Sequence, residues 1–207
     1  MTAEIDHELQ RSLRAASDGL TPAGPTAEAL ARLAERADGE GVLDVAYGQA
    51  DSPLGPLTVA VTRRGLVRIA YAERGLDEVL RELAARVSPR VLEAPARIEP
   101  VRRELDEYFA GERRAFETPI DWSLTRGFFR RVLEATAAIP FAEARSYAQV
   151  ASAAGSPRAV RAAGNGLGSN PIPIVVPCHR VLRTGGGLGG YTGGVERKRR
   201  LLALERG

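Results

Sequence analysis

The sequence contains a single cysteine, Cys178, and only two histidines, His7 and His179, among its 207 residues. One cysteine cannot form an internal disulfide, and these three residues cannot supply the four cysteine and histidine ligands of a structural zinc site. Aromatic residues are also scarce, at 5% of the chain. These absences exclude a disulfide-stabilised fold, and no metal site is predicted.

Long apolar runs are missing as well. Residues 1–10 lack a basic segment followed by an apolar stretch, and no run approaches the roughly 18 consecutive apolar residues of a membrane span. We therefore expect neither a secretion signal nor a membrane anchor, and we expect a cytoplasmic protein. In that reducing compartment Cys178 remains a free thiol, so it is available as a nucleophile.

The composition that is present is globular and mildly basic. Hydrophobic residues make up 44% and charged residues 27% of the chain, with a formal net charge of +3. A chain of this length and composition can bury a sizeable core, as one large domain or two small ones. The positive charge suits a polyanionic partner such as a nucleic acid without identifying one.

Residues 1–41 are predicted to form an appended arm, loosely packed or disordered. Two short helical patterns, over residues 5–13 and around Leu30 and Leu33, are separated by breaker residues at 21–25. Each pattern is too short and too weakly apolar to fold alone. We hypothesise that the leucines of this arm pack on the domain that follows.

Residues 42–119 are predicted to form an α+β domain built on a small antiparallel sheet. Short β-branched and apolar runs, separated by proline-rich and glycine-rich turns, predict an antiparallel meander, and two helical patterns follow it. The predicted strands are residues 43–47, 57–62 and 66–71, and the predicted helices include residues 76–83 and 101–109.

Residues 120–207 are predicted to form a mainly helical domain that contains a helix-turn-helix. Helical patterns at residues 147–154 and 158–164 are separated by a three-residue turn. Ser156 is expected to cap the second helix, with Pro157 in its first turn, where a missing N–H costs nothing. The same local pattern also fits a helical hairpin buried in a core.

Two arginines near the start of the second helix favour the DNA-binding interpretation. The recognition helix of a helix-turn-helix presents its N-terminal residues to DNA. Arg158 and Arg161 occupy such positions, so we expect both to contact DNA. We also expect a DNA contact from Arg180, in the segment that carries the cysteine.

Residues 169–181 (SNPIPIVVPCHRV) contain the features that point to chemistry. The apolar run at residues 172–176 is predicted to be a buried strand that its prolines keep out of a regular sheet, and it would place Cys178 rigidly. A thiol with an ordinary pKa of about 8.5 is a weak nucleophile that needs a base. His179 is the candidate base, acting directly or through a bridging water, and Glu205 is the candidate to orient it. The alternative is a small buried cysteine beside an incidental histidine.

Residues 177–181 (PCHRV) resemble the active-site motif of the methylated-DNA–protein-cysteine methyltransferases, also called 6-O-alkylguanine-DNA alkyltransferases. The resemblance extends from about Asp44 to the end of the chain. It includes SPLGPL at residues 52–57, IPFAEARSY at residues 139–147 and GYTGG at residues 190–194.

This resemblance implies a ribonuclease H-like N-terminal domain and a helical C-terminal domain that binds double-stranded DNA. The implied activity is DNA repair by transfer of an alkyl group from 6-O-alkylguanine to Cys178, with 4-O-alkylthymine as a second candidate substrate. The damaged base must rotate into a pocket, because its alkylated oxygen cannot otherwise reach a buried thiol. The thioether product is inert, so each molecule acts once, as a monomer and without a cofactor.

The resemblance also assigns roles around the thiol. Tyr147 looks like the phenol that donates a hydrogen bond to the guanine, and Asn170 matches the asparagine that braces the segment carrying Cys178. Glu205 matches the acid that orients His179, which is expected to deprotonate the thiol through water.

Further positions match the residues that hold the rotated base. The carbonyl of Val181 is expected to accept a hydrogen bond from the guanine amino group. Tyr191 and Thr192 are expected in the loop that closes the pocket. Arg161 looks like the finger that enters the base stack in place of the rotated nucleotide.

Several positions depart from the usual pattern of the family. Ala142 stands where a glycine is usual, and Phe129 replaces a usual glutamine. Asn165 and Ser169 replace larger or basic residues near the DNA-facing helix, which predicts weaker DNA binding without a change in the chemistry. The basic run at residues 197–200 is predicted to be a solvated helix face.

Three other functions compete with this interpretation. A related sensor would recognise alkylated guanine without removing the alkyl group, but such proteins lack the cysteine. A cysteine hydrolase using Cys178 and His179 would turn over many times without DNA, which the helix-turn-helix disfavours. A plain transcription factor would normally be dimeric, and it would leave the thiol unexplained.

Overall fold

The computed structural model describes residues 26–207 of the chain. The predicted helix over residues 5–13 lies outside the described residues. The chain divides into two compact units after Leu33, and the second unit, Ala34–Gly207, contains both β-sheets. No helix in the described part of the chain is long and apolar enough to span a membrane.

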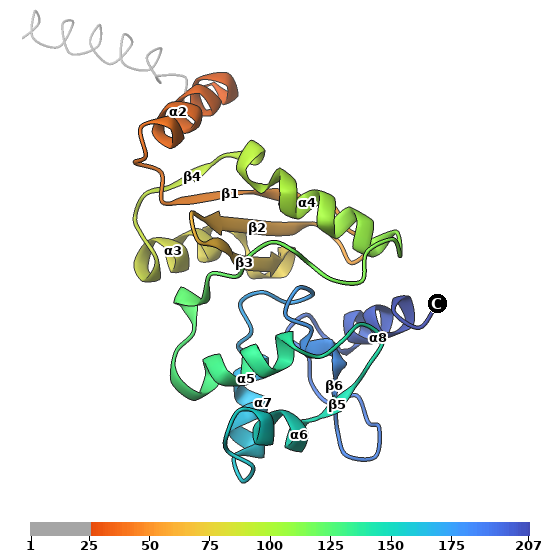
Figure 1. The fold of residues 1–207 in the computed structure, drawn as a ribbon. Helices are drawn as coiled ribbons and strands as arrows, with labels where there is room; N and C mark the ends of the chain where they lie inside the picture. The colour runs from red at the N-terminus through yellow and green to blue at the C-terminus, as the bar shows by residue number, and fades with distance from the viewer. Residues whose placement is uncertain (1–25) are drawn as a thin grey trace, which may run out of the picture. The chain divides into compact units, whose positions relative to one another are not determined.

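Helix α2 (Ala27–Gly39) is the described part of the predicted arm (Figure 1). Leu30 and Leu33, the leucines expected to pack, are 41% and 51% exposed, whereas Ala34 and Ala37 are buried in the main core. Small alanine side chains therefore make the close contacts of this helix. The sequence analysis left open whether this arm is loosely packed or disordered, and the structure shows that residues 27–39 form a helix.

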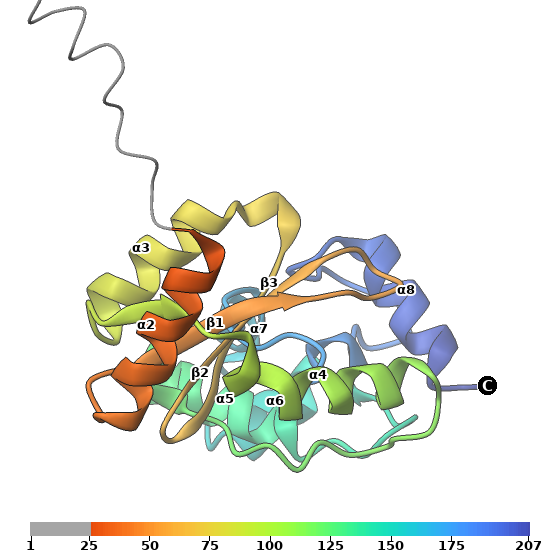
Figure 2. The same cartoon turned by 90° about the horizontal axis from the view of Figure 1, so that it is seen from above.

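The N-terminal domain contains a four-stranded sheet in the order β3-β2-β1-β4 (Figures 1 and 2). Strands β1 (Val45–Ala50), β2 (Leu57–Thr62) and β3 (Gly65–Tyr71) form the predicted antiparallel meander. Strand β4 (Val91–Glu93) was not predicted, and it pairs with β1 in parallel, which makes the sheet mixed. Three residues are too few to show a strand periodicity in the sequence.

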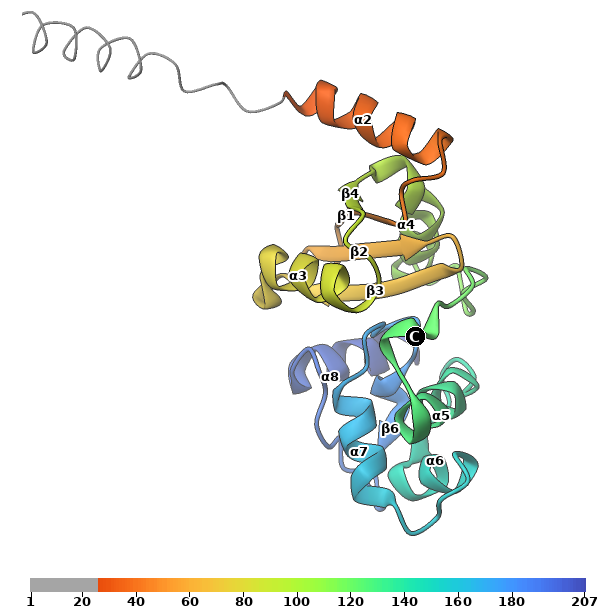
Figure 3. The same cartoon turned by 90° about the vertical axis from the view of Figure 1, so that its left-hand side faces the viewer.

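Helices cover both faces of this sheet (Figure 3). Helix α3 (Leu76–Arg86) buries Val79 and Leu83 against one face, in a small apolar cluster of its own. Helix α4 (Pro95–Phe109) packs on the opposite face, in the larger core that continues into the C-terminal domain. Both helices lie where the apolar periodicity predicted them, and the α+β class is confirmed.

The C-terminal domain is mainly helical, as predicted, and lies alongside the edge strand β3. There the N–H of Ile69 donates to the carbonyl of Pro171 at 2.9 Å. The α-helices of this domain are α5 (Gly127–Ala137), α6 (Tyr147–Ala153), α7 (Val160–Gly168) and α8 (Val195–Leu204). The short elements of the second unit are η1 (Ala72–Arg74), η2 (Trp122–Leu124) and η3 (Cys178–Arg180), with β5 (Arg145–Ser146) parallel to β6 (Val181–Leu182).

Helices α6 and α7 form the predicted helix-turn-helix pair (Figure 1). Ser146 and Gln149 form a capping box at the start of α6. Helix α7 begins at Val160 without a side-chain cap, so the prediction that Ser156 caps it is wrong. The carbonyl of Ser156 instead accepts from the N–H of Ala159 at 2.9 Å, which makes a separate turn before the helix begins.

Candidate active site

The segment that carries the cysteine is buried, as predicted, but it does not form a strand. Residues 171–177 run through consecutive turns. Pro171, Pro173 and Pro177 lack an N–H donor, so no regular ladder can form here. Ile174 is fully buried and has a positive φ of 77°, a conformation that a branched residue adopts only where its surroundings fix it.

Cys178 is the first residue of η3 and is 4% exposed. The Nδ2 atom of Asn170 donates to the carbonyl of Val176 at 2.9 Å and to the sulfur of Cys178 at 3.2 Å. The Oδ1 atom of the same amide accepts from the N–H of Ile172 at 3.0 Å. One side chain thus connects both ends of the turn segment to the sulfur.

The environment of Cys178 favours the neutral thiol. Burial raises the pKa of Cys178 to about 11, although the hydrogen bond from Asn170 and the charge of Lys198 both act to lower it. A thiol with this pKa is almost entirely protonated at neutral pH. A nucleophilic role therefore requires a base that removes the proton during the reaction.

His179 and Glu205 form a buried pair next to the cysteine. The Nε2 atom of His179 lies 2.8 Å from Oε1 of Glu205, and the hydroxyl of Tyr108, on α4, donates to the same oxygen at 2.7 Å. Burial raises the pKa of Glu205, but the hydrogen bonds from His179 and Arg180 outweigh it and hold this pKa at about 2. The carboxylate is therefore ionised, and it can accept a hydrogen bond from an Nε2 atom that carries a proton.

The second ring nitrogen of His179 is left without a partner. Burial lowers the pKa of His179, so the imidazole is neutral at physiological pH. A neutral ring that donates from Nε2 carries a lone pair on Nδ1. Within the described residues this buried Nδ1 has no hydrogen-bond partner, so it is the atom on which the ring can accept a proton.

Arg180, which was expected to contact DNA, lies in the interior of the domain. Its guanidinium is buried, donates to both oxygens of Glu205 and donates to the carbonyl of Ile139 at 2.6 Å. This burial does not favour the predicted DNA contact of Arg180, which stays a prediction. Its guanidinium neutralises Glu205 inside the core.

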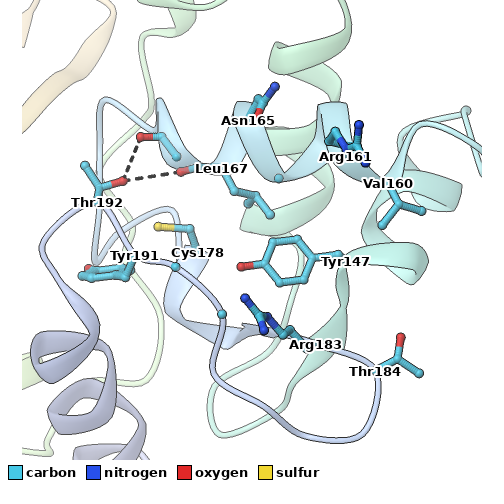
Figure 4. A pocket seen from close by; sticks show the side chains of 14 residues that line it. Tyr147, Val160, Arg161, Asn165, Leu167, Cys178, Arg183, Thr184, Tyr191 and Thr192 are labelled. Carbon is cyan, nitrogen blue, oxygen red and sulfur yellow. Dashed lines mark hydrogen bonds between the residues drawn. The ribbon is translucent and has the colours of Figure 1, made fainter.

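The thiol opens onto a cavity of about 550 Å³ (Figure 4). Tyr147 and Tyr191 extend into this cavity from two sides of Cys178, and Thr192 anchors the loop above it through a 3.2 Å hydrogen bond to the carbonyl of Gly168. The structure thus brings these predicted pocket residues together. In the part of the chain that the structure describes, no cluster of three or more histidine, cysteine, aspartate or glutamate residues could hold a metal ion.

Lys198 was missed by the sequence analysis. It belongs to the basic run predicted to be solvated, yet it is fully buried and donates to the carbonyl of Val181. Its Nζ lies 5.9 Å from the centre of the Tyr147 ring, and burial lowers its pKa to about 8. The signal was available, because Lys198 lies one helical turn before the buried residues Leu201 and Leu202.

The two arginines of the helix-turn-helix occupy different places. Arg161, in the first turn of α7, is exposed and lines the mouth of the cavity. Arg158 is also exposed but lies in the turn before α7, away from the cavity lining. Arg161 can therefore contact both a ligand in the cavity and a polymer bound outside it, whereas Arg158 can contact only a polymer bound outside the cavity.

Two family models match the chain. The model of the 6-O-methylguanine DNA methyltransferase ribonuclease-like domain matches residues 45–122, and the model of the DNA binding domain of the same family matches residues 127–207. Together they cover most of the described residues. The first match ends at the first residue of η2, and the second begins at the first residue of α5.

Curated relatives and solved structures agree with these matches. The methylated-DNA–protein-cysteine methyltransferase of Mycobacterium tuberculosis is 40% identical over 160 residues, covering 77% of this chain and 92% of the relative. The constitutive enzyme of Bacillus subtilis is 38% identical over 164 residues, covering 77% and 94%. The crystal structure of M. tuberculosis OGT in complex with DNA has a TM-score of 0.67 at 39% identity, covering 78% of this chain and 92% of that one. The chain therefore belongs to the 6-O-methylguanine DNA methyltransferase family.

Proposed function

We propose that this protein repairs alkylated DNA by moving an alkyl group from 6-O-alkylguanine onto its own Cys178. The observation that carries the proposal is the placement of the single cysteine on a cavity of about 550 Å³, with a hydrogen bond to its sulfur and a buried histidine–carboxylate pair next in sequence. DNA is the partner that the family and its DNA-bound member indicate. All of these side chains come from one chain, so we expect a monomer to suffice.

The transfer needs the thiol to lose its proton and the bonding electrons of C–O6 to pass to guanine. Nδ1 of His179 takes the proton of Cys178 through one water molecule, and Glu205 stabilises the imidazolium through Nε2. The thiolate attacks the alkyl carbon in line, so that an S–C bond forms while the C–O6 bond breaks. The electron pair passes into the guanine ring, which takes up a proton overall and leaves as guanine.

Tyr147 is placed to assist the leaving group. Its ring borders the cavity beside Cys178, and burial raises the pKa of its hydroxyl, so the phenol keeps its proton and can donate to the guanine ring. The carbonyl of Val181 accepts from Lys198. Val181 is fully buried and is not among the residues that line the cavity, so the structure does not support its predicted contact with the guanine amino group. Tyr191 and Thr192 form the wall on the far side of the base.

The buried thiol requires the base to leave the DNA stack. Cys178 is 4% exposed, so an alkylated oxygen within a duplex cannot approach its sulfur. Arg161 projects from the first turn of α7 at the mouth of the same cavity, where it can replace the rotated nucleotide. We propose that Arg158 holds the DNA backbone next to this point, because it is exposed in the turn before α7.

The test is intact-protein mass spectrometry after incubation with duplex DNA that contains one 6-O-methylguanine. The wild type should gain one methyl group per protein, mapped to Cys178, while Cys178→Ser gains none. A parallel duplex with 4-O-methylthymine tests the second candidate substrate. Tight binding to the lesion without a mass change would instead indicate a sensor, and repeated hydrolysis of a small ester without DNA would indicate a hydrolase.

A further inference from the structure

The lining of the active-site cavity is cationic. Arg161 and Arg183 both line it, and no aspartate or glutamate does. The ammonium of Lys198 lies just behind the wall, 5.9 Å from the centre of the Tyr147 ring. The transfer of a methyl group uses none of this charge directly, because a methyl group has no atom to pair with it.

Arg183 is the cation of this set that has no assigned task. Its side chain is exposed, and neither an ion pair nor a hydrogen bond of its guanidinium occurs within the described residues. Its backbone is fixed, since its N–H donates to the carbonyl of Gly187 at 2.7 Å and its carbonyl accepts from the N–H of Gly186 at 2.9 Å. The backbone of Arg183 is thus fixed at the cavity, and its charge has no partner in the described part of the chain.

Arg183 lines the same cavity as Tyr147 and Cys178. In Figure 4 it is drawn beside the Tyr147 ring, near the end of the ring that carries the hydroxyl. Its charge acts on the phenol, since it lowers the pKa of Tyr147 against the larger effect of burial. A group bound beside the Tyr147 hydroxyl in this cavity would therefore experience this positive charge.

We propose that Arg183 makes the cavity selective for alkyl groups that carry a negative charge, such as the carboxymethyl group of 6-O-carboxymethylguanine. The proposal rests on the alkyl transfer proposed above. A guanidinium binds a carboxylate through two parallel N–H···O contacts, and a cavity without acidic residues offers no competing partner. The neutral methyl group would gain nothing from Arg183.

The reaction with such a substrate follows the same course. The sulfur of Cys178 attacks the methylene carbon, the S–CH₂ bond forms, and the CH₂–O6 bond breaks. The electron pair and the thiol proton end on guanine, and the protein retains an S-carboxymethylcysteine. The carboxylate takes no part in the bond changes, so Arg183 acts as a specificity residue and not as a catalytic one.

The experiment compares two lesions of equal size and different charge. Single-turnover transfer rates are measured for 6-O-carboxymethylguanine and 6-O-carbamoylmethylguanine in the same duplex, with the wild type and with Arg183→Gln. The two alkyl carbons differ in intrinsic reactivity, so the two rates are not compared directly. For each protein, the carboxymethyl rate is divided by the carbamoylmethyl rate, and the wild-type ratio is then divided by the ratio of Arg183→Gln. We expect this quotient to be about twofold to fivefold, as for a partly exposed ion pair, and to fall at high salt.

Two further variants serve as controls. Arg183→Lys should keep the preference in part, because it retains the charge but loses the fork geometry. Arg199→Gln removes an exposed arginine of α8 that pairs with Glu196, and it should leave the rate ratio of the wild type unchanged. Melting temperatures confirm that each variant is folded.

The outcomes separate this proposal from the one on which it rests. A quotient of one, with normal transfer from 6-O-methylguanine, overturns the role of Arg183 and leaves the proposed function intact. Equal slowing of both lesions in Arg183→Gln also overturns it, since that result indicates a contact with the DNA backbone. Absence of transfer from 6-O-methylguanine by the wild type overturns both proposals.

Discussion

The hydroxyl of Tyr71, on the last residue of β3, lies 2.8 Å from the hydroxyl of Tyr191, in the loop that lines the active-site cavity. The two rings meet edge to face, with their centres 6.3 Å apart. Arg197 lies over the Tyr71 ring at 4.4 Å and donates to the carbonyl of Leu54 at 3.0 Å. The sheet domain thus supports one wall of the cavity from behind.

Replacing Tyr71 with phenylalanine should weaken that wall. The change removes one hydrogen bond and leaves the Tyr191 hydroxyl without its partner, which costs about 1 kcal/mol. We expect the melting temperature to fall by about 2–4 °C and alkyl transfer to slow by about fivefold. Thermal unfolding and single-turnover transfer from free 6-O-benzylguanine measure the two effects. Tyr47→Phe, on β1, is the matched control, and an identical response of both variants would contradict this role of Tyr71.

Replacing Arg161 with alanine should separate base rotation from the chemistry. Arg161 lies at the cavity mouth but is exposed, so its loss should not disturb the thiol. We expect repair in duplex DNA to slow by about tenfold or more, because the rotated base is no longer replaced in the stack. Transfer from free 6-O-benzylguanine should change much less. Equal losses on the two substrates would rule out a role in rotation.

Stability should decrease as the pH falls, in two pH ranges that follow from the buried pair of His179 and Glu205. Burial lowers the pKa of His179 below its ordinary value of 6.5. As the pH falls below 6.5, the histidine of the unfolded chain binds a proton more readily than the buried one, so the folded state loses stability. The pKa of Glu205 is held at about 2 against 4.5 for a free glutamate, so its contribution is present above pH 4.5 and is lost towards pH 2. Melting temperatures measured from pH 8 to pH 2 test both ranges.

The variant Glu205→Gln isolates the carboxylate. It leaves Arg180 buried without its counter-charge, which should cost about 3 kcal/mol at neutral pH and lower the melting temperature by about 6–12 °C. The difference from the wild type should shrink as the pH falls from about 4.5 towards 2, since protonation removes the same charge from the wild type. A difference that stays constant over this range would mean that the ionised form of Glu205 does not stabilise the fold.

Ala142 is strained, and glycine should relieve the strain. Its φ is 61°, in the left-handed region, and its N–H donates to Oε2 of Glu205 at 3.2 Å. Relief of this conformation outweighs the greater chain entropy of glycine, so we expect Ala142→Gly to stabilise the protein by about 0.5–1 kcal/mol. Thermal unfolding should show a rise of about 2 °C. Ala144→Gly is a nearby control without a positive φ and should lower the melting temperature or leave it unchanged.

The sequence by itself determined which residues are the candidates for the chemistry. A single thiol followed by a histidine, and the resemblance of residues 177–181 and their neighbours to one family, were sufficient to select Cys178, Asn170 and Glu205. The meander and the main helices also followed from apolar periodicity, because each depends on residues close together in the chain.

Only the tertiary structure decided which charges are buried and which remain free. Tyr108 and Glu205 are 97 residues apart, and no local pattern could pair them. Arg180 and Arg183 are three positions apart and look alike in the sequence. The first is hydrogen-bonded to Glu205, whereas the guanidinium of the second lines the cavity and has no partner among residues 26–207. The physical reason is that burial and ion pairing depend on what the rest of the fold places around a side chain, whereas reactivity and periodicity are properties of the residues themselves.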